Sequence, residues 1–118
     1  MTSNAIGVDF GTSNSTAAFV DGVEPVLVPL EGGRFDLPSA VFFDFETGLR
    51  KYGRSAIDAY VGDAEGRFMR ALKSILGTSL EDDSTYVAGK RVAFSDIIAG
   101  FIRSIKTTAE EYRGTEID

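Results

Sequence analysis

Residues 6–28 read IGVDFGTSNSTAAFVDGVEPVLV and consist of short apolar runs separated by turn-forming residues. The pair Asp21-Gly22 tolerates the positive φ angles of a tight two-residue turn, so residues 15–20 and 23–28 are expected to pair as an antiparallel hairpin. Pro25 has no backbone N–H to donate within a sheet, and it therefore indicates a sheet edge or a bulge. This opening predicts a mainly antiparallel N-terminal sheet.

Further short elements are predicted after this hairpin, because the apolar pattern continues in short blocks and then changes from a period of two to a helical period. Phe68, Leu72, Ile75 and Leu76 would share one side of a helix that ends at Gly77, a glycine cap. Pro38-Ser39 is assigned to strand geometry. The expected elements are a hairpin of residues 39–45 with 49–52, helices over 54–62 and 65–76, and a small hairpin around Gly89.

The C-terminal part of the chain predicts the longest helix, over residues 95–113, with Ser95 as its N-cap and Gly114 as its end. An apolar stripe at helical spacing favours packing against a core. The stripe consists of Ile97, Ile98, Phe101, Ile102, Ile105, Ala109 and Tyr112. The fold class predicted from these patterns is α+β, with an antiparallel or mixed sheet and a long helix packed on one face of it.

Composition excludes several functional classes. The 118 residues contain no Cys and no His, which removes a thiol nucleophile, an imidazole base and the usual zinc ligands, so any metal would be a hard cation such as Mg²⁺ held by oxygen. A net charge of −6 argues against nucleic acid as a partner. The apolar runs are shorter than the roughly 20 residues of a membrane span, and the N-terminus has no signal-peptide pattern. We therefore expect a cytoplasmic protein without a membrane or nucleic-acid partner.

The residues between Asp9 and Asn14 combine a carboxylate, a glycine and short polar side chains. A carboxylate at the end of an apolar strand is expected to be buried, which is costly unless it meets a cation or strong donors. Gly11 allows close backbone approach, and Thr12, Ser13 and Asn14 add donors typical of a phosphate-binding turn. The alternative is a simple strand turn in which these side chains bond their own backbone. The P-loop and G-x-G-x-x-G patterns are absent, so a phosphate would be held by a hairpin.

IGVDFGTSNST resembles the first phosphate motif of the actin, hexokinase and Hsp70 ATPase superfamily, a D-x-G-T-[ST] turn between two strands. Four later segments resemble Hsp70 nucleotide-binding domains in the family's order. They are LPSAVFFD, YGRSAIDAY, LKSILGTSLEDD and VAFSDIIAGFIRSIKTTAEEYRG. The resemblance covers nearly the whole chain, and the GTSNST sequence is most similar to the bacterial YegD-type group.

The resemblance implies a role for each matching residue. Asp9 would face Mg²⁺ and its water shell, Gly11, Thr12, Ser13 and Asn14 would line the β- and γ-phosphates of ATP or ADP, and Lys73 would be the catalytic lysine. The fold implied is the first part of a ribonuclease H-like lobe (residues 1–37 and 95–118) with a small upper subdomain (38–94). Asn14 and Ser74 depart from the family, which usually has an aromatic residue and an arginine there.

The resemblance also implies an ATPase chaperone as the parent protein, with unfolded polypeptides and co-chaperones as partners. The family's second phosphate loop, D-x-G-G-G-T, does not occur in this sequence. We therefore expect the 118-residue chain alone to be inactive and to bind ATP·Mg²⁺ poorly or not at all. We also expect it to self-associate, through an open sheet edge or through the surface formed by Ile98, Phe101, Ile102 and Ile105.

Two other readings of the sequence remain open. A sugar kinase or acetate kinase of the same superfamily also begins with D-x-G-T-[ST], although it would need a sugar-binding insertion. A truncated, non-enzymatic interaction module is the second alternative, in which an uncovered sheet edge binds a partner.

Overall fold

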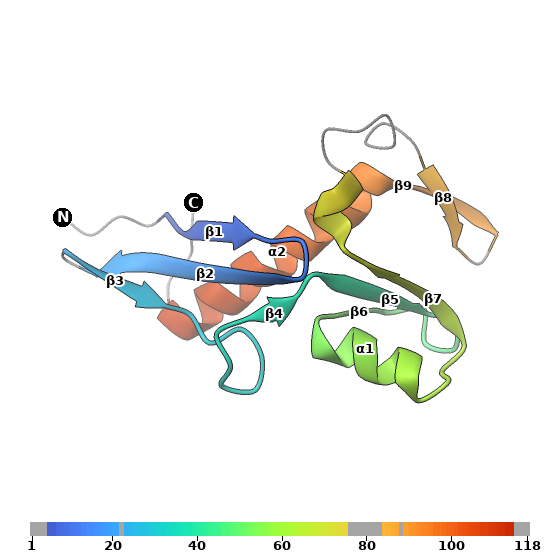
Figure 1. Ribbon diagram of the computed structural model, residues 1–118, viewed down its shortest axis with the longest axis horizontal. Coiled ribbons are helices and arrows are strands. Elements are labelled where there is room, and N and C mark those ends of the chain that lie inside the picture. Colours follow the sequence, from blue (N-terminus) through green and yellow to red (C-terminus); the bar gives the residue numbers. More distant parts are fainter. Residues whose placement is uncertain (1–4, 22, 76–83, 88, 115–118) are drawn as a thin grey trace.

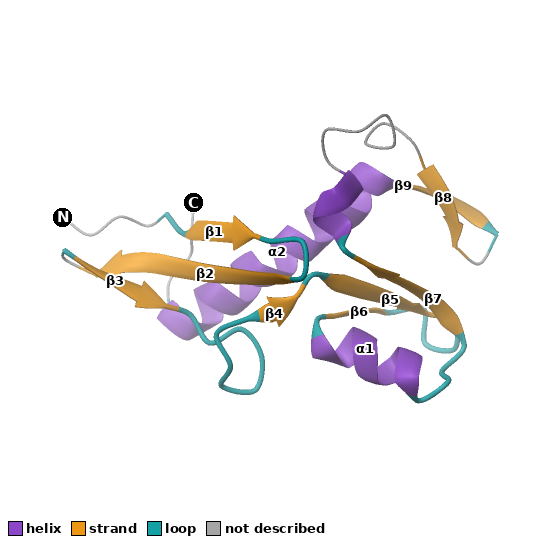
Figure 2. Ribbon diagram, viewed as in Figure 1, coloured by secondary structure: helices purple, strands orange, loops and turns teal. Residues whose placement is uncertain are grey.

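The computed structural model describes residues 5–21, 23–75, 84–87 and 89–114. The strands of these residues form three antiparallel sheets of four, three and two strands (Figures 1 and 2). A long C-terminal helix runs behind the first sheet (Figure 1). The predicted α+β class, with antiparallel sheets and a long helix, is confirmed at this level.

The first sheet is built around strand β2 (Asn14–Asp21). Strand β1 (Gly7–Phe10) pairs with one edge of β2, and strands β3 (Glu24–Leu27) and β4 (Leu37–Pro38) pair with the other edge. The predicted β2–β3 hairpin is confirmed. Pro25 lies opposite Val20 on β3, which has no second partner strand among the described residues, and this agrees with the edge position expected for proline.

The second sheet is built around strand β5 (Ala40–Asp44), and every residue of β5 is buried. Strands β6 (Arg50–Tyr52) and β7 (Gly66–Arg70) flank it, and helix α1 (Arg54–Val61) lies alongside. Phe42 packs toward α1, where it meets Ala56, whereas Phe43 belongs to the main core. Because both faces of β5 are covered, its sequence AVFFD is continuously apolar up to its last residue.

One predicted helix is wrong. Residues 66–70 of the expected helix 65–76 form strand β7, and only Leu72–Ile75 is helical, as the short 3-10 helix η1. Five residue pairs with β5, from Ala40 opposite Arg70 to Asp44 opposite Gly66, stabilise the strand. Local apolar spacing was overridden by this pairing with a distant segment. The predicted cap at Gly77 lies outside the described residues.

The C-terminal part consists of a hairpin that leads directly into the long helix. Strands β8 (Ser84–Val87) and β9 (Lys90–Ala93) form the hairpin predicted around Gly89, and helix α2 (Phe94–Arg113) follows without a loop. The predicted Ser95 cap is wrong: Ala93 is the N-cap residue, and no side chain caps the helix start. Gly114 ends α2 in the left-handed conformation, as predicted, with φ 77°. No helix in the described part of the chain is long and apolar enough to cross a membrane.

Phe101 of α2 lies at the centre of the main core and is completely buried. Its ring lies 5.7 Å from the ring of Phe10 on β1 and 6.0 Å from the ring of Tyr52 on β6. It therefore contacts both larger sheets. Ile97, Ile98, Ile105 and Ala109 are buried on the same side of the helix, which confirms the expected core role of most of the stripe.

This burial corrects one expected surface for self-association. Ile98 is 6% exposed, and Phe101 and Ile105 are 0% exposed, so they are not available to a second chain; Ile102, at 36%, is partly accessible. The core residues of β1, β2, β5 and β6 already cover this side of the helix.

Polar contacts attach α1 to the loop that precedes β4. The Glu31 carboxylate accepts hydrogen bonds from the backbone N–H of Arg54 at 2.9 Å and of Ser55 at 3.3 Å, which caps the first turn of the helix. The Arg54 guanidinium donates two hydrogen bonds to Asp36 in the same loop. One goes to the Asp36 carboxylate at 3.2 Å and the other to the Asp36 backbone carbonyl at 3.0 Å. The loop and the helix therefore hold each other in place.

A test of the core replaces Phe101 with Ala. We expect the variant to lose about 3–5 kcal/mol of unfolding free energy, because a buried ring that contacts two sheets is replaced by a cavity. Chemical denaturation followed by circular dichroism measures the change. Ile102→Ala, on the next and partly exposed position, is the matched control and should lose much less. Equal losses in the two variants would contradict the central role of Phe101.

A second test concerns Asp44, whose side chain is only 8% exposed. The Thr47 backbone N–H lowers the pKa of its carboxyl, burial opposes this effect, and the Glu46 N–H and the Lys51 ammonium lower it further. A lowered pKa in the folded state stabilises the protein above the unfolded-state pKa, and this contribution disappears as pH falls through the folded-state value.

We expect Asp44→Asn to melt below the wild type at pH 7, with a difference that shrinks as the pH falls below about 4. Thermal unfolding from pH 7 to pH 2 measures this dependence. Asp58→Asn, at an exposed position of α1, is the control and should leave the pH dependence unchanged. A melting difference that stays constant over the whole range would show that the carboxylate charge does not stabilise the turn.

We still expect self-association through the edge of the first sheet. Within the described residues, β1 pairs with β2 alone, so its outer edge has unpaired backbone groups. Val20 and Leu27 are 45% and 51% exposed in the same sheet. Sedimentation equilibrium should show a homodimer or larger species, and replacing Val8 with Pro in β1 should reduce it. A single monomeric species at tens of micromolar would end the expectation.

Candidate functional site

The loop between β1 and β2 is a tight turn that only glycine can begin. The backbone N–H of Gly11 donates to the carbonyl of Asn14 at 3.1 Å. A Cβ atom at position 11 would lie 2.3 Å from the Asn14 carbonyl oxygen, far closer than any side chain tolerates. Gly11 therefore sets the shape of the turn, and Thr12, Ser13 and Asn14 remain exposed on it.

The turn is held from below by two buried hydroxyl groups. Ser39, between β4 and β5, donates from its Oγ to the Gly11 carbonyl at 2.8 Å, and its backbone N–H donates to the Ser13 carbonyl at 2.9 Å. The Ser15 hydroxyl lies 2.9 Å from that of Ser39, and both residues are almost completely buried. Sequence reasoning gave Ser39 only a role in strand geometry, whereas the structure shows that it also fixes the loop.

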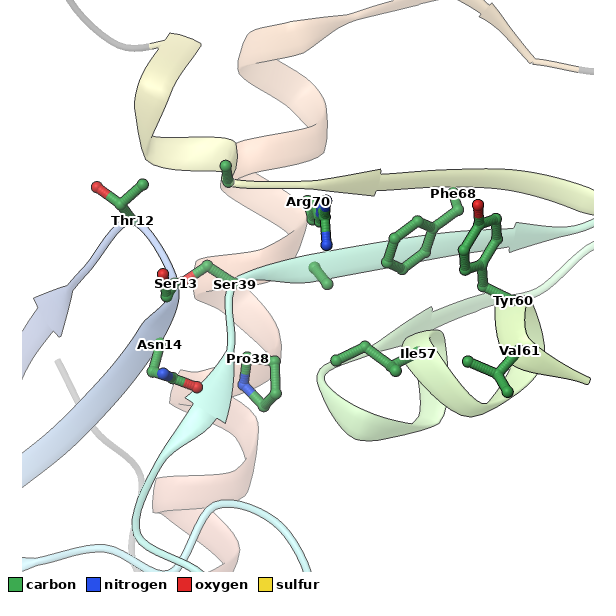
Figure 3. A pocket seen from close by; sticks show the side chains of 12 residues that line it. Thr12, Ser13, Asn14, Pro38, Ser39, Ile57, Tyr60, Val61, Phe68 and Arg70 are labelled. Atoms are coloured by element: carbon green, nitrogen blue, oxygen red, sulfur yellow. The ribbon is translucent and has the colours of Figure 1, made fainter.

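A cavity of about 450 Å³ opens beside this loop (Figure 3). Its volume is within the usual range of small-molecule sites. One end of the cavity is polar and the other is apolar. The polar end contains Thr12, Ser13, Asn14, Ser39 and Arg70, and the apolar end contains Ile57, Tyr60, Val61 and Phe68. The rings of Tyr60 and Phe68 stack at 4.5 Å with an interplanar angle of 13°.

Among the residues that the structure describes, Arg70 is the only charged one in the lining of this cavity. It is exposed at the end of β7, and it forms no ion pair with any residue in the described ranges. The expected helix 65–76 concealed this residue, because a helix would not place Arg70 and Phe68 on the same face. The two-residue alternation of Phe68 and Arg70 in strand β7 was the signal that could have identified it.

The structure brings together only some of the candidate residues. Thr12, Ser13 and Asn14 line the cavity, and Gly11 shapes the turn above it, whereas Asp9 and Lys73 do not line it. Lys73 is exposed on η1.

The expected burial of Asp9 is wrong, because the residue is exposed on β1. Asp9 lies opposite Thr16, and its neighbour Phe10 packs against Phe101 of α2, so Asp9 lies on the sheet face turned away from the helix. In the described ranges, no three acidic, histidine or cysteine side chains gather into a metal site. A single exposed carboxylate can hold Mg²⁺ only when waters and phosphate oxygens supply the other ligands, as they usually do for Mg²⁺ bound with a nucleotide.

No protein-family model matches the chain.

The close contact at Gly11 gives a direct test of the loop. We expect Gly11→Ala to displace the Asn14 carbonyl and to break the bond between the Ser39 hydroxyl and the Gly11 carbonyl. The variant should lose about 1–3 kcal/mol of unfolding free energy and show large amide shifts for residues 11–15 in NMR spectra. Gly32→Ala is the control that tests whether replacing any loop glycine causes the same amide shifts. That position has positive φ but open space around it, so its amide shifts should stay local.

Proposed function

We propose that residues 11–14 bind the phosphates of ATP and ADP, and that the chain is the first part of an Hsp70-like nucleotide-binding domain. The observation that carries the proposal is the arrangement of Thr12, Ser13 and Asn14. They are exposed on a turn fixed by buried hydroxyl groups, and they border a cavity in which the one charged side chain among the described lining residues, that of Arg70, is positive. A pre-organised set of donors stabilises phosphate charge without the cost of ordering a loop.

The other candidate residues have distinct roles in this proposal. Asp9 would hold Mg²⁺ through its water shell, and the bound ion neutralises charge on the phosphates. Lys73 would contact the phosphoryl group that is transferred, as a compact positive charge. Lys73 is exposed on the 3-10 helix η1, which begins directly after the cavity-lining residues Arg70 and Ala71.

The proposal extends to the activity of the family that the sequence resembles. The proposed activity is ATP hydrolysis coupled to protein folding in the cytoplasm, with unfolded polypeptides and co-chaperones as partners. Hydrolysis requires groups on both sides of the nucleotide, and catalysis by positioning is lost when half of them are absent. The described residues supply one side, with one phosphate loop, so the chain alone should be inactive.

A titration with ATP·Mg²⁺ followed by amide NMR tests the proposed phosphate site. We expect shifts at Gly11–Asn14 and at Ser39, with a dissociation constant of about 1 mM or weaker, because the ligand is contacted from one side only. The double variant Thr12→Val with Ser13→Ala should lose these shifts, since both hydroxyl donors are removed.

Thr107→Val, at an exposed position of α2, removes a hydroxyl that does not line the cavity and should leave the titration unchanged. Absence of shifts at residues 11–14 in the wild type would refute the phosphate site. A micromolar constant would refute the expectation that the chain presents only part of an ATP site.

A further inference from the structure

Arg70 is brought to the cavity by the register of strand β7. It is the last residue of the strand and lies opposite Ala40 of β5, which also lines the cavity. Side chains alternate along a strand, so Arg70 lies on the same face as Phe68, and Met69 lies on the opposite face, where it packs against the main core. Figure 3 shows Arg70 between Ser39 on one side and Phe68 on the other.

The chain changes direction immediately after Arg70. Ala71 has a φ of 55°, in the left-handed region that residues other than glycine rarely adopt. This conformation ends β7 and begins η1, so Lys73 continues on a different element and does not line the cavity. Of the two basic residues around this turn, only Arg70 shares the cavity with the loop.

The electrostatic setting of Arg70 favours an anion. The chain carries 18 acidic and 12 basic residues, yet no acidic residue of the described ranges lines the cavity. The nearest basic residue on the same strand, Arg67, is exposed and lies on the other face, where it donates to the Tyr86 carbonyl at 3.5 Å. Arg54, by contrast, is paired with Glu31 and Asp36. Arg70 has no such partner among the described residues.

We propose that Arg70 binds a phosphoryl group of the ligand, opposite the donors of Thr12, Ser13 and Asn14. This inference rests on the proposed function and adds to it a positive contact from the second sheet. The planar guanidinium offers several N–H donors that match two oxygens of one phosphate. The ligand class is a polyphosphate chain such as that of a nucleotide. The part of the site that this chain supplies would then combine the loop of the first sheet with the last residue of β7.

Inorganic tripolyphosphate is the probe, because it contains the phosphate chain without an adenosine group. Amide NMR reports which residues it contacts, and isothermal titration calorimetry at low ionic strength measures the dissociation constant. We expect Arg70→Ala to weaken binding about tenfold, since a charge-assisted hydrogen bond is lost. Arg70→Lys keeps the charge but not the two-oxygen geometry, so its affinity should lie between those of the wild type and Arg70→Ala.

Arg67→Ala is the matched control, because it removes the same charge from the same strand on the opposite face. It should bind tripolyphosphate within about twofold of the wild type, as expected for a screened charge. Thermal unfolding of each variant confirms that it is folded, and Arg70→Gln replaces Arg70→Ala if the alanine variant is not.

Two failures are distinguishable. If tripolyphosphate shifts the amides of residues 11–14 equally in the wild type and in Arg70→Ala, with equal dissociation constants, the role of Arg70 is refuted and the phosphate loop stands. If the wild type shows no shift at residues 11–14, the proposed function fails and the role of Arg70 fails with it. An equal loss of affinity in Arg67→Ala and Arg70→Ala would also refute the inference, because it would show an effect of net charge alone.

Discussion

The packing of Phe101 between Phe10 and Tyr52 is the contact on which the arrangement of the molecule depends. Sheets of three or four short strands need a covered apolar face to be stable. Helix α2 supplies this cover, and one of its aromatic residues, Phe101, reaches β1 and β6 together. The loop after β1 and the end of β7 belong to different sheets, so their meeting at one cavity follows from this shared helix.

Ser39 connects the two sheets at the site itself. It lies between β4, which belongs to the first sheet, and β5, which belongs to the second, and it hydrogen-bonds to the loop from both its side chain and its backbone. A buried hydroxyl is tolerated there because Ser15 and the Gly11 carbonyl satisfy it. The geometry of the loop is thus coupled to the junction of the sheets, and a shift of one would move the donors that border the cavity.

Local signals predicted much of the fold, whereas the site depended on distant pairing. The hairpins, α1 and the C-terminal end of α2 were predicted because turn residues and apolar periods act over a few neighbours. Strand β7 was missed because β5, more than twenty residues earlier, determines its conformation. The same error hid Arg70. The burial of Asp9 was wrong because the sequence alone did not indicate which face of β1 the helix covers.

An acidic protein that binds an anion needs a binding site whose local charge is positive although its net charge is negative. The net charge of −6 repels a polyphosphate at long range, but at physiological salt screening limits this repulsion to about 8 Å, whereas a contact inside a cavity is screened much less. Within the described residues, the lining has no acidic side chain and Arg70 has no ion-pair partner, so the cavity is locally positive in a molecule with a net negative charge. Added salt then weakens the attraction of Arg70 and the long-range repulsion together. Affinity for a phosphate ligand should therefore depend less steeply on salt than in a protein that attracts anions through a broad basic surface.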